Sequence, residues 1–276
     1  GDAGRERTVA LKVLPPHLAR RPEAVTHFLD EARLASRLDH PNIVAVHDLG
    51  RAGDEYFIAM EYVDGADLER LLRAQRERGA QVPLAVALTI LRRVCDGLHA
   101  AHTARDADGA PLQLIHRDVK SGNVLLSRRG AVKLGDFGIA RAATTARTTT
   151  VGETKGTAEV MAPEQRMGHD LDARADVFAV AALGYELLTG AAVNLDLAIL
   201  AQLGTEGWPH LPMPSTLRPE LPAALDTILI DALAYLPAGR PDSCQVLERS
   251  LAAVAAQHEL VCGDEAIATW LAEELR

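Results

Sequence analysis

An eight-residue segment, His116–Asn123, carries three side chains of complementary chemistry within six positions. Asp118 can accept a proton, Lys120 can neutralise an anion, and Asn123 can offer its carboxamide oxygen to a metal ion. This set suits the transfer of a phosphoryl group, because that reaction depends mainly on positioning and on stabilisation of charge. A solvated polar loop in front of the apolar residues Val124–Leu126 is the alternative explanation for the same residues.

Composition limits the classes of protein that the chain can belong to. Its 276 residues suffice for one large domain or two lobes, and 48% hydrophobic with 24% charged residues argues against disorder. The net charge of −9 disfavours a general nucleic-acid binder or a binder of anionic membranes. Three widely spaced cysteines without a CxxC pair predict free thiols in a reducing compartment.

The ends and the hydropathy of the chain predict its location. No apolar run approaches the roughly 20 residues that a bilayer-spanning helix needs. No signal peptide is recognisable at the start of the sequence. We therefore expect a cytoplasmic protein, or the cytoplasmic part of a longer one.

The first part of the chain is rich in residues that favour strands, with one amphipathic helix among them. In that helix Phe28, Ala32 and Ala35 share one face. Val63–Ala66 interrupts the pattern and predicts a hinge between two lobes. The predicted elements are strands over residues 8–14, 43–48 and 56–62 and a helix over residues 22–38, with a turn at residues 51–54.

The rest of the chain is predominantly helical in pattern. Ala173–Thr189 is apolar nearly all round, which predicts a buried central helix. Asp106–Gly109 resembles part of a calcium loop but lacks its third acidic position and closing glutamate, so a turn is predicted. Strands early and helices late indicate an α+β architecture in two lobes. Two short strands are expected at residues 124–127 and 131–134, and helices at residues 67–78, 84–103, 173–189, 194–203, 222–234, 242–257 and 264–275.

Several motifs occur in the order in which eukaryotic-type Ser/Thr protein kinase domains carry them. The chain therefore resembles this family over most of its length, and its alanine and arginine usage and the insertion at residues 103–114 indicate a bacterial member. The motifs are Val9-Ala10-Leu11-Lys12, Glu31, His116-Arg117-Asp118 with Asn123, Asp136-Phe137-Gly138, Met161-Ala162-Pro163-Glu164, Asp176 and Arg240.

The resemblance implies a protein-kinase-like fold of the α+β class. A small antiparallel-sheet lobe is expected at residues 1–63 and a large, mainly helical lobe at residues 64–258. Residues 259–276 are expected to form a C-terminal helical extension.

The resemblance also assigns the chemistry of the polar segment. Asp118 is expected to orient and deprotonate the substrate hydroxyl, and Lys120 to steady the transferring phosphoryl group. Asn123 and Asp136 are expected to bind Mg²⁺, with Mn²⁺ as the alternative ion. The spacing of Asp118 and Lys120 resembles that of Ser/Thr kinases, and Thr157 is expected to bond to both and shape the acceptor pocket.

ATP is the nucleotide that the resemblance implies. Lys12 is expected to hold its α- and β-phosphates and to pair with Glu31. Met60 is the expected gatekeeper, and backbone groups of Glu61 and Val63 are expected to bond adenine. The remaining expected contacts are Ala10 and Leu125 on the faces of the base and Asp67 at the ribose.

Other matches imply structural roles. His116 is expected to pack against Phe137 rather than act as an acid or a base. Glu164 and Arg240 are expected to form a buried ion pair. Asp176 is expected to tie the backbone of the polar segment to the buried helix.

The threonine-rich residues 141–154 are expected to carry regulation. Arg117 precedes Asp118, and kinases with this arrangement commonly need a phosphate, which carries about −1.5 to −2 charge and can pair with arginine. We expect autophosphorylation there, between self-associating copies; a threonine-rich loop without this role is the alternative. The candidates are Thr148, Thr149, Thr150 and Thr154.

The resemblance breaks down ahead of Lys12. Only eleven residues precede it, and Gly1–Gly4 is not the GxGxxG loop that covers the phosphates in the family. The explanations are a truncation, omitted residues or a natural loss, of which truncation is favoured because the later catalytic residues are intact. Each missing N–H contact to phosphate would forfeit about 1–3 kcal/mol.

The sequence thus predicts a serine/threonine protein kinase that transfers the γ-phosphoryl group of ATP to hydroxyls of protein substrates. The alternative is a pseudokinase-like scaffold that binds nucleotide or protein with little or no transfer. An unrelated nucleotide hydrolase is disfavoured, since Walker and GxSxG sequences are absent.

Overall fold

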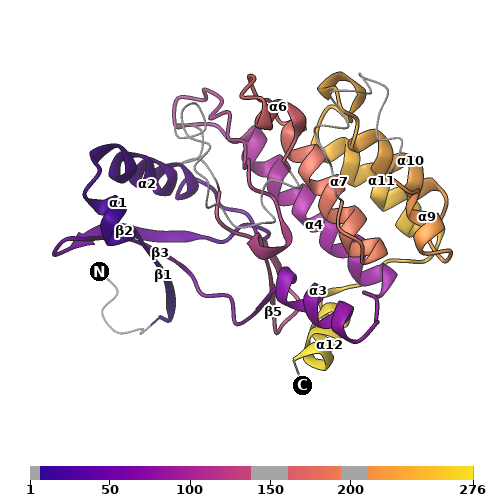
Figure 1. Cartoon of the computed structure of the whole chain (residues 1–276). Coiled ribbons are helices and arrows are strands. Elements are labelled where there is room, and N and C mark those ends of the chain that lie inside the picture. The colour runs from indigo at the N-terminus through magenta and orange to yellow at the C-terminus, as the bar shows by residue number, and fades with distance from the viewer. Residues whose placement is uncertain (1–6, 138–160, 194–210, 276) are drawn as a thin grey trace.

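The computed structural model describes residues 7–137, 161–193 and 211–275. One lobe consists of a small antiparallel sheet with helix α2 (Pro22–Ala35) beside it, and a larger, mainly helical lobe follows (Figure 1). This is the α+β arrangement in two lobes that the order of predicted strands and helices indicates. The lobe boundaries at residues 63 and 258 stay predictions.

The sheet of the small lobe has the strand order β1-β3-β2, all antiparallel. Lys12 lies opposite Ile58 across β1 and β3, and helix α2 buries Phe28, Ala32 and Ala35, the face predicted from the sequence. A helical turn that was not predicted, α1 (Pro16–Ala19), follows β1, since a proline at a helix start needs no N–H partner. The strands are β1 (Val9–Val13), β2 (Val46–Ala52) and β3 (Glu55–Glu61).

The second strand is shifted relative to its prediction. It begins three residues late and continues to Ala52, so the expected turn at residues 51–54 is confined to Gly53, with φ 62°, and Asp54. The residues before it bond to the other lobe: the Val44 N–H donates to the Leu134 carbonyl (2.9 Å), and the Leu134 N–H donates to the Asn42 carbonyl (2.8 Å). Alternating side chains predict extended backbone, but they do not identify its partner.

A second antiparallel sheet, of order β4-β5-β6, belongs to the larger lobe. Its first strand falls where the sequence predicts only a hinge. A Cβ at Gly65 would lie 1.8 Å from the Leu126 carbonyl oxygen, so glycine permits the two strands to pair where a side chain would not. The strands are β4 (Gly65–Asp67), β5 (Val124–Ser127) and β6 (Val132–Leu134).

The helices of the larger lobe pack around α7, which is buried along nearly its whole length as predicted. The predicted helices are confirmed to within a few residues, apart from that over residues 194–203, which lies outside the described residues; the short helices α6 and α9 were not predicted. The bounds are α3 (Leu68–Glu77), α4 (Leu84–Thr103), α6 (Pro163–Arg166), α7 (Arg174–Thr189), α9 (Pro214–Leu217), α10 (Ala224–Ala232), α11 (Cys244–Gln257) and α12 (Asp264–Glu274), with 3₁₀ turns η1 (Ser121–Asn123) and η3 (Pro237–Gly239).

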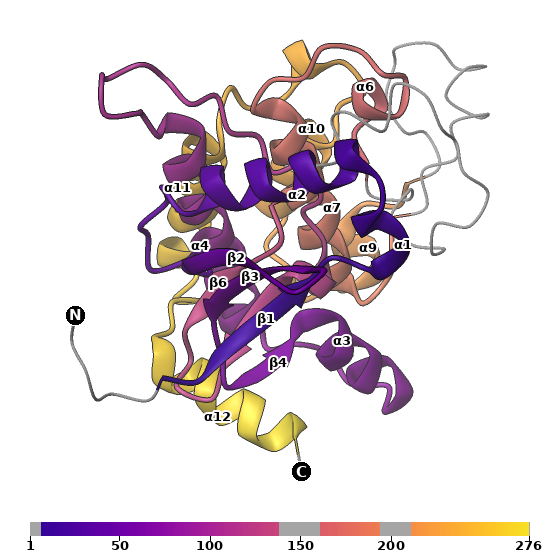
Figure 2. The same ribbon diagram turned by 90° about the vertical axis from the view of Figure 1, so that its left-hand side faces the viewer.

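The last helix, α12, packs near β5 and α3 (Figures 1 and 2). It buries Ile267, Trp270 and Leu271 in the core of the larger lobe, and Glu274 forms an ion pair with Arg78 at the end of α3. The predicted C-terminal helical extension is therefore packed against the domain within the described chain.

The three cysteines are free thiols, as predicted. Cys95 and Cys244 are buried free thiols, and Cys262 is a partly buried one. Searching the described segments finds no helix with both the length and the apolar character of a membrane span.

A buried ion pair fixes α6 to the end of the larger lobe, as predicted. Arg240 Nη1 lies 2.6 Å from Glu164 Oε1, and Arg240 Nη2 lies 2.8 Å from Glu164 Oε2. The same guanidinium donates to the carbonyls of Ala234, Tyr235 and Arg174. Because all of these bonds are made away from water, removal of either charge leaves the other uncompensated.

A second buried carboxylate, on α7, binds the backbone of the polar segment. Asp176 Oδ2 accepts from the His116 N–H (2.8 Å), and Oδ1 accepts from the Arg117 N–H (2.9 Å). His102 Nε2 lies 2.7 Å from the same carboxylate. Burial opposes its charge, but the His102 contact and the N–H bonds outweigh burial and hold the pKa of Asp176 below its ordinary value.

His116 is a packing residue, as predicted. Its ring centroid lies 4.5 Å from that of Phe137, and Nε2 lies 3.0 Å from the Gly135 carbonyl. Complete burial lowers the pKa of His116, although Asp176 opposes the shift. The imidazole is therefore neutral in the folded protein at neutral pH.

Glu164→Ala is expected to lower the free energy of unfolding by about 3–5 kcal/mol, because it leaves the buried Arg240 charge without a counter-charge. Urea unfolding followed by circular dichroism measures this. As a control, Arg33→Ala removes an exposed pair with Asp30 and should cost about 0–1 kcal/mol. Equal small losses in both variants would contradict the interpretation.

Stability is expected to fall as the pH drops below about 6.5, since the unfolded chain then binds a proton that buried His116 resists. Because the folded pKa is the lower one, the loss grows until the pH reaches that folded value. Urea unfolding at pH 7.5 and 5.5 should show a smaller difference for His116→Phe than for the wild type. His17→Gln, at an exposed position, should leave the difference unchanged; a wild-type difference in His116→Phe would contradict the prediction.

Candidate active site

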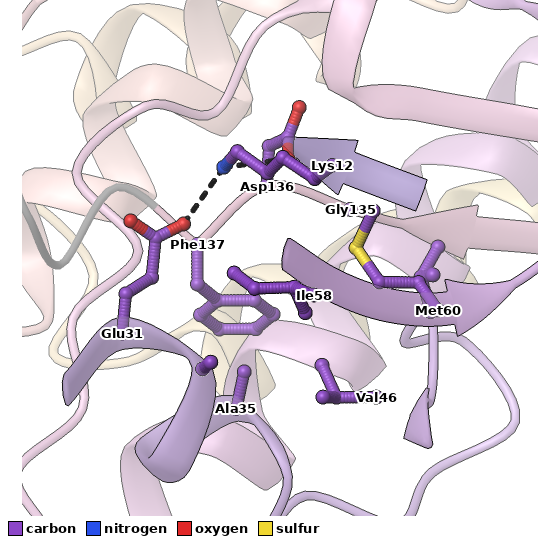
Figure 3. Close-up of a pocket in the computed structure, with 11 residues that line it drawn as sticks. Lys12, Glu31, Ala35, Val46, Ile58, Met60, Gly135, Asp136 and Phe137 are labelled. Carbon is purple, nitrogen blue, oxygen red and sulfur yellow. Dashed lines mark hydrogen bonds and ion pairs between the residues drawn. The ribbon is translucent and has the colours of Figure 1, made fainter. Parts of the chain in front are cut away.

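Three charged side chains from separate elements meet at the junction of the lobes. Lys12 Nζ on β1 lies 2.9 Å from Glu31 Oε1 on α2 and 3.0 Å from Asp136 Oδ1, which follows β6 (Figure 3). Burial opposes the Lys12 charge, but Asp136 and then Glu31 outweigh it and raise the pKa of Lys12 above its ordinary value. The site thus holds an ammonium ion between two carboxylates.

Local structure explains why these three side chains converge. The side chains of β1 alternate, so Lys12 turns inward while Leu11 and Val13 stay exposed. Glu31 lies on the buried face of α2. Asp136 has φ 53°, a left-handed conformation that is uncommon for residues other than glycine and that concentrates at functional sites.

A pocket extends from this ion pair between α2 and the sheet (Figure 3). Most of the residues that line it are apolar, and Met60, the predicted gatekeeper, is one of them. The lining residues are Lys12, Glu31, Ala32, Ala35, Val44, Val46, Ile58, Met60, Gly135, Asp136 and Phe137.

The other predicted nucleotide contacts lie outside this pocket. Ala10 is opposite Met60 in the first sheet, and Leu125 is opposite Asp67 in the second. Asp67 already caps α3 by accepting from the Arg70 N–H at 2.8 Å. The roles of Ala10, Val63, Asp67 and Leu125 stay predictions.

The hinge residue Glu61 is bound on both its backbone and its side chain. Its N–H donates to the Ala45 carbonyl at 2.8 Å. Its carboxylate lies 2.8 Å from Lys133 Nζ on β6. Sequence reasoning missed Lys133, because an isolated lysine in a strand resembles a surface residue.

The three polar side chains of the segment His116–Asn123 contact one another. Lys120 Nζ lies 2.9 Å from Asp118 Oδ2, and Asn123 Nδ2 donates to the same oxygen at 3.1 Å and to the Asp118 carbonyl at 2.7 Å. The Asp118 carboxylate is therefore fixed by an ammonium and an amide. Such a carboxylate can accept a proton from a hydroxyl placed beside it.

Two residues near this loop were missed from the sequence. His102 binds Asp176 from α4, and Gln165 Nε2 on α6 donates to the Arg117 carbonyl at 2.7 Å. Both are single polar residues beside buried helical positions, and no spacing in the sequence distinguishes them from ordinary surface residues.

Asn123 and Asp136 offer an oxygen-donor pair that fits a hard divalent cation. They lie close in the fold, because the Gly135 N–H donates to the Asn123 carbonyl at 2.9 Å. The described segments contain no cluster of three or more His, Cys, Asp or Glu side chains able to hold a metal alone.

Some predicted features lie outside the described residues. These are Gly138, Thr157, the candidate phosphorylation sites Thr148, Thr149, Thr150 and Thr154, and Gly1–Gly4.

Comparison with known proteins gives consistent matches over most of the chain. Tyrosine-protein kinase MasK of Myxococcus xanthus is 41% identical over 261 residues, which cover 94% of this chain and 40% of that protein. Serine/threonine-protein kinase PknE of Mycobacterium tuberculosis is 37% identical over 243 residues, covering 88% of this chain and 41% of that protein. The chain thus spans about two fifths of the length of these relatives.

Solved structures of protein kinase domains also match this chain. The crystal structure of the Mycobacterium tuberculosis PknI kinase domain matches with a TM-score of 0.65 and 34% identity, covering 90% of this chain and 86% of that one. The family model described as "Protein kinase domain" matches residues 2–248. The chain therefore belongs to the protein kinase domain family.

Proposed function

We propose that this domain transfers the γ-phosphoryl group of ATP to serine or threonine hydroxyls of protein substrates. The observation that carries the proposal is the pair of charge clusters at the lobe junction: Asp118 with Lys120 and Asn123, and Lys12 between Glu31 and Asp136. Protein kinases use ATP and a divalent metal ion for this reaction.

Asp118 acts on the substrate hydroxyl. Its carboxylate accepts the hydroxyl proton while the oxygen attacks the phosphoryl group, and Asn123 and Lys120 keep it oriented. Lys120 also offsets the negative charge that spreads over the phosphoryl oxygens.

Lys12 binds the α- and β-phosphates and stays charged, since its pKa is raised. Glu31, with a side chain only 10% exposed, orients that ammonium. Met60, Glu61, Val63, Ala10 and Leu125 surround the adenine, and Asp67 reaches the ribose.

Asn123 and Asp136 hold Mg²⁺, or Mn²⁺ in its place. When bound, the ion neutralises charge on the phosphate oxygens. The support for this assignment is the chemistry of the two oxygen donors and their adjacency beside Gly135.

Serine and threonine are the proposed acceptors because Lys120 follows Asp118 at the spacing typical of kinases for these residues. The names of the relatives differ on this point: MasK is named a tyrosine kinase and PknE a serine/threonine kinase. Acceptor choice therefore needs a direct test.

Activation by phosphorylation is a further part of the proposal. Nε of Arg117 is buried and has no hydrogen-bond partner among the described residues, which suits an anionic group arriving from elsewhere. Phosphothreonine at Thr148, Thr149, Thr150 or Thr154 is the proposed anion, formed between two self-associating copies.

Asp118→Asn is expected to lower the rate of phosphoryl transfer by about 10²–10⁴-fold, because the amide cannot accept the proton. Transfer from radiolabelled ATP measures the rate, and a nucleotide-induced shift of the unfolding temperature should persist. Asp54→Asn, at an exposed turn, is the matched control and should keep full activity. Nucleotide binding without transfer in the wild type would favour the scaffold function instead.

The acceptor is tested with peptides that differ only in carrying serine, threonine or tyrosine. We expect transfer to serine and threonine at least about tenfold faster than to tyrosine, because Lys120 is held against Asp118 where the longer phenol would have to fit. Phosphoamino-acid analysis of autophosphorylated protein should show the same order. Phosphotyrosine as the main product would overturn the assignment.

A further inference from the structure

The backbone on both sides of Arg117 is held by three hydrogen bonds to side chains. The Arg117 N–H donates to Asp176 on α7 (2.9 Å), and the Asp118 N–H donates to His116 Nδ1 (3.3 Å). The Arg117 carbonyl accepts from Gln165 Nε2 on α6 at 2.7 Å, the shortest of the three bonds.

The bond from Gln165 fixes the orientation of Asp118. A peptide is planar, so a fixed Arg117 carbonyl also fixes the direction of the Asp118 N–H and the position of its Cα. Arg117 has φ 67°, a left-handed conformation that costs energy for arginine and persists only when its surroundings impose it. Gln165 supplies the contact on the side of the carbonyl that neither Asp176 nor His116 reaches.

The helix that carries Gln165 is firmly anchored. The preceding residue, Glu164, forms the buried ion pair with Arg240, and Pro163 is buried as well. Met167, just after α6, is exposed and contacts the Tyr235 hydroxyl rather than the polar segment. Gln165 is thus the side chain through which anchored α6 contacts the backbone next to Asp118.

We infer that Gln165 is a positioning residue: by binding the Arg117 carbonyl, it sets the orientation of the Asp118 carboxylate. The inference rests on the proposed kinase activity and adds a link to it: a neutral hydrogen bond connects α6 to the peptide next to the proton acceptor. A displacement of α6 would be transmitted to Asp118 without any change at the nucleotide.

Three substitutions of similar length test whether the donor matters. Gln165→Met keeps the shape but has no donor, and Gln165→Glu turns a carboxylate toward the carbonyl oxygen. Gln165→Lys restores a donor, which the partly exposed site can accommodate. We expect kcat to fall about tenfold for Met and at least as much for Glu, but less than about threefold for Lys, because small misplacements of a reacting group are costly. KM for ATP should stay within about twofold in all three.

Met167→Ala is the matched control, since it alters the neighbouring surface but not the bond, and it should retain wild-type kcat. Glu164→Ala shows what loss of the anchor does to stability. A kcat for Gln165→Met within twofold of wild type would overturn the inference. So would a loss in Gln165→Met accompanied by lost nucleotide binding and a fall in unfolding temperature as large as that of Glu164→Ala. If the Met variant does not fold, Lys no more active than Glu overturns it.

Hydrogen exchange separates this inference from the proposed function. Amides of residues 116–123, followed by mass spectrometry, should exchange faster in Gln165→Met than in Met167→Ala, whether or not the protein transfers phosphate. Unchanged protection would overturn the inference. Absence of transfer in the wild type, with the difference in exchange present, would count against the proposed function alone.

Discussion

The carboxylate of Asp176 is the interaction on which the active-site geometry depends. It is fully buried, yet it stays charged, because two backbone N–H groups and His102 compensate the cost of burial. Those two N–H groups belong to the residues just before Asp118. The buried helix α7 therefore carries, in its first turn, the anion that holds the polar segment.

The charged cluster around Lys12 differs from the Asp176 site, because two of its three members are partly exposed to solvent. Lys12 and Asp136 remain partly exposed, with side-chain exposures of 34% and 51%, so their attraction is weakened by solvent. Glu31 is the most buried of the three side chains, and its contact with Lys12 Nζ orients the ammonium group. The polar segment is fixed by the core, whereas Lys12 lies between two carboxylates and can exchange partners when another anion arrives.

Much of this site could be predicted from the sequence, because its residues stand in ordered motifs with fixed chemistry. The meeting of Lys12 with Glu31, of His116 with Phe137, and of Glu164 with Arg240 was predicted and is confirmed. Strand β4 and the bonds of Asn42 and Val44 to β6 were not predicted, since they depend on how closely two backbones approach. Gln165 and His102 were not predicted for another reason. Each acts through a contact to a residue distant in the sequence, and no periodicity in the neighbouring sequence indicates that contact.

The bonds between residues 42–44 and β6 have a mechanical consequence. They lie directly before the segment that carries Asp136 and, with the ion pair between Glu61 and Lys133, connect the base of the small lobe to the larger one. A rotation of the small sheet relative to the helices would pivot there, so the distance from Lys12 to Asp136 would change more than that from β6 to Asp136. Opening and closing of the domain would then alter the width of the nucleotide site while leaving its floor in place.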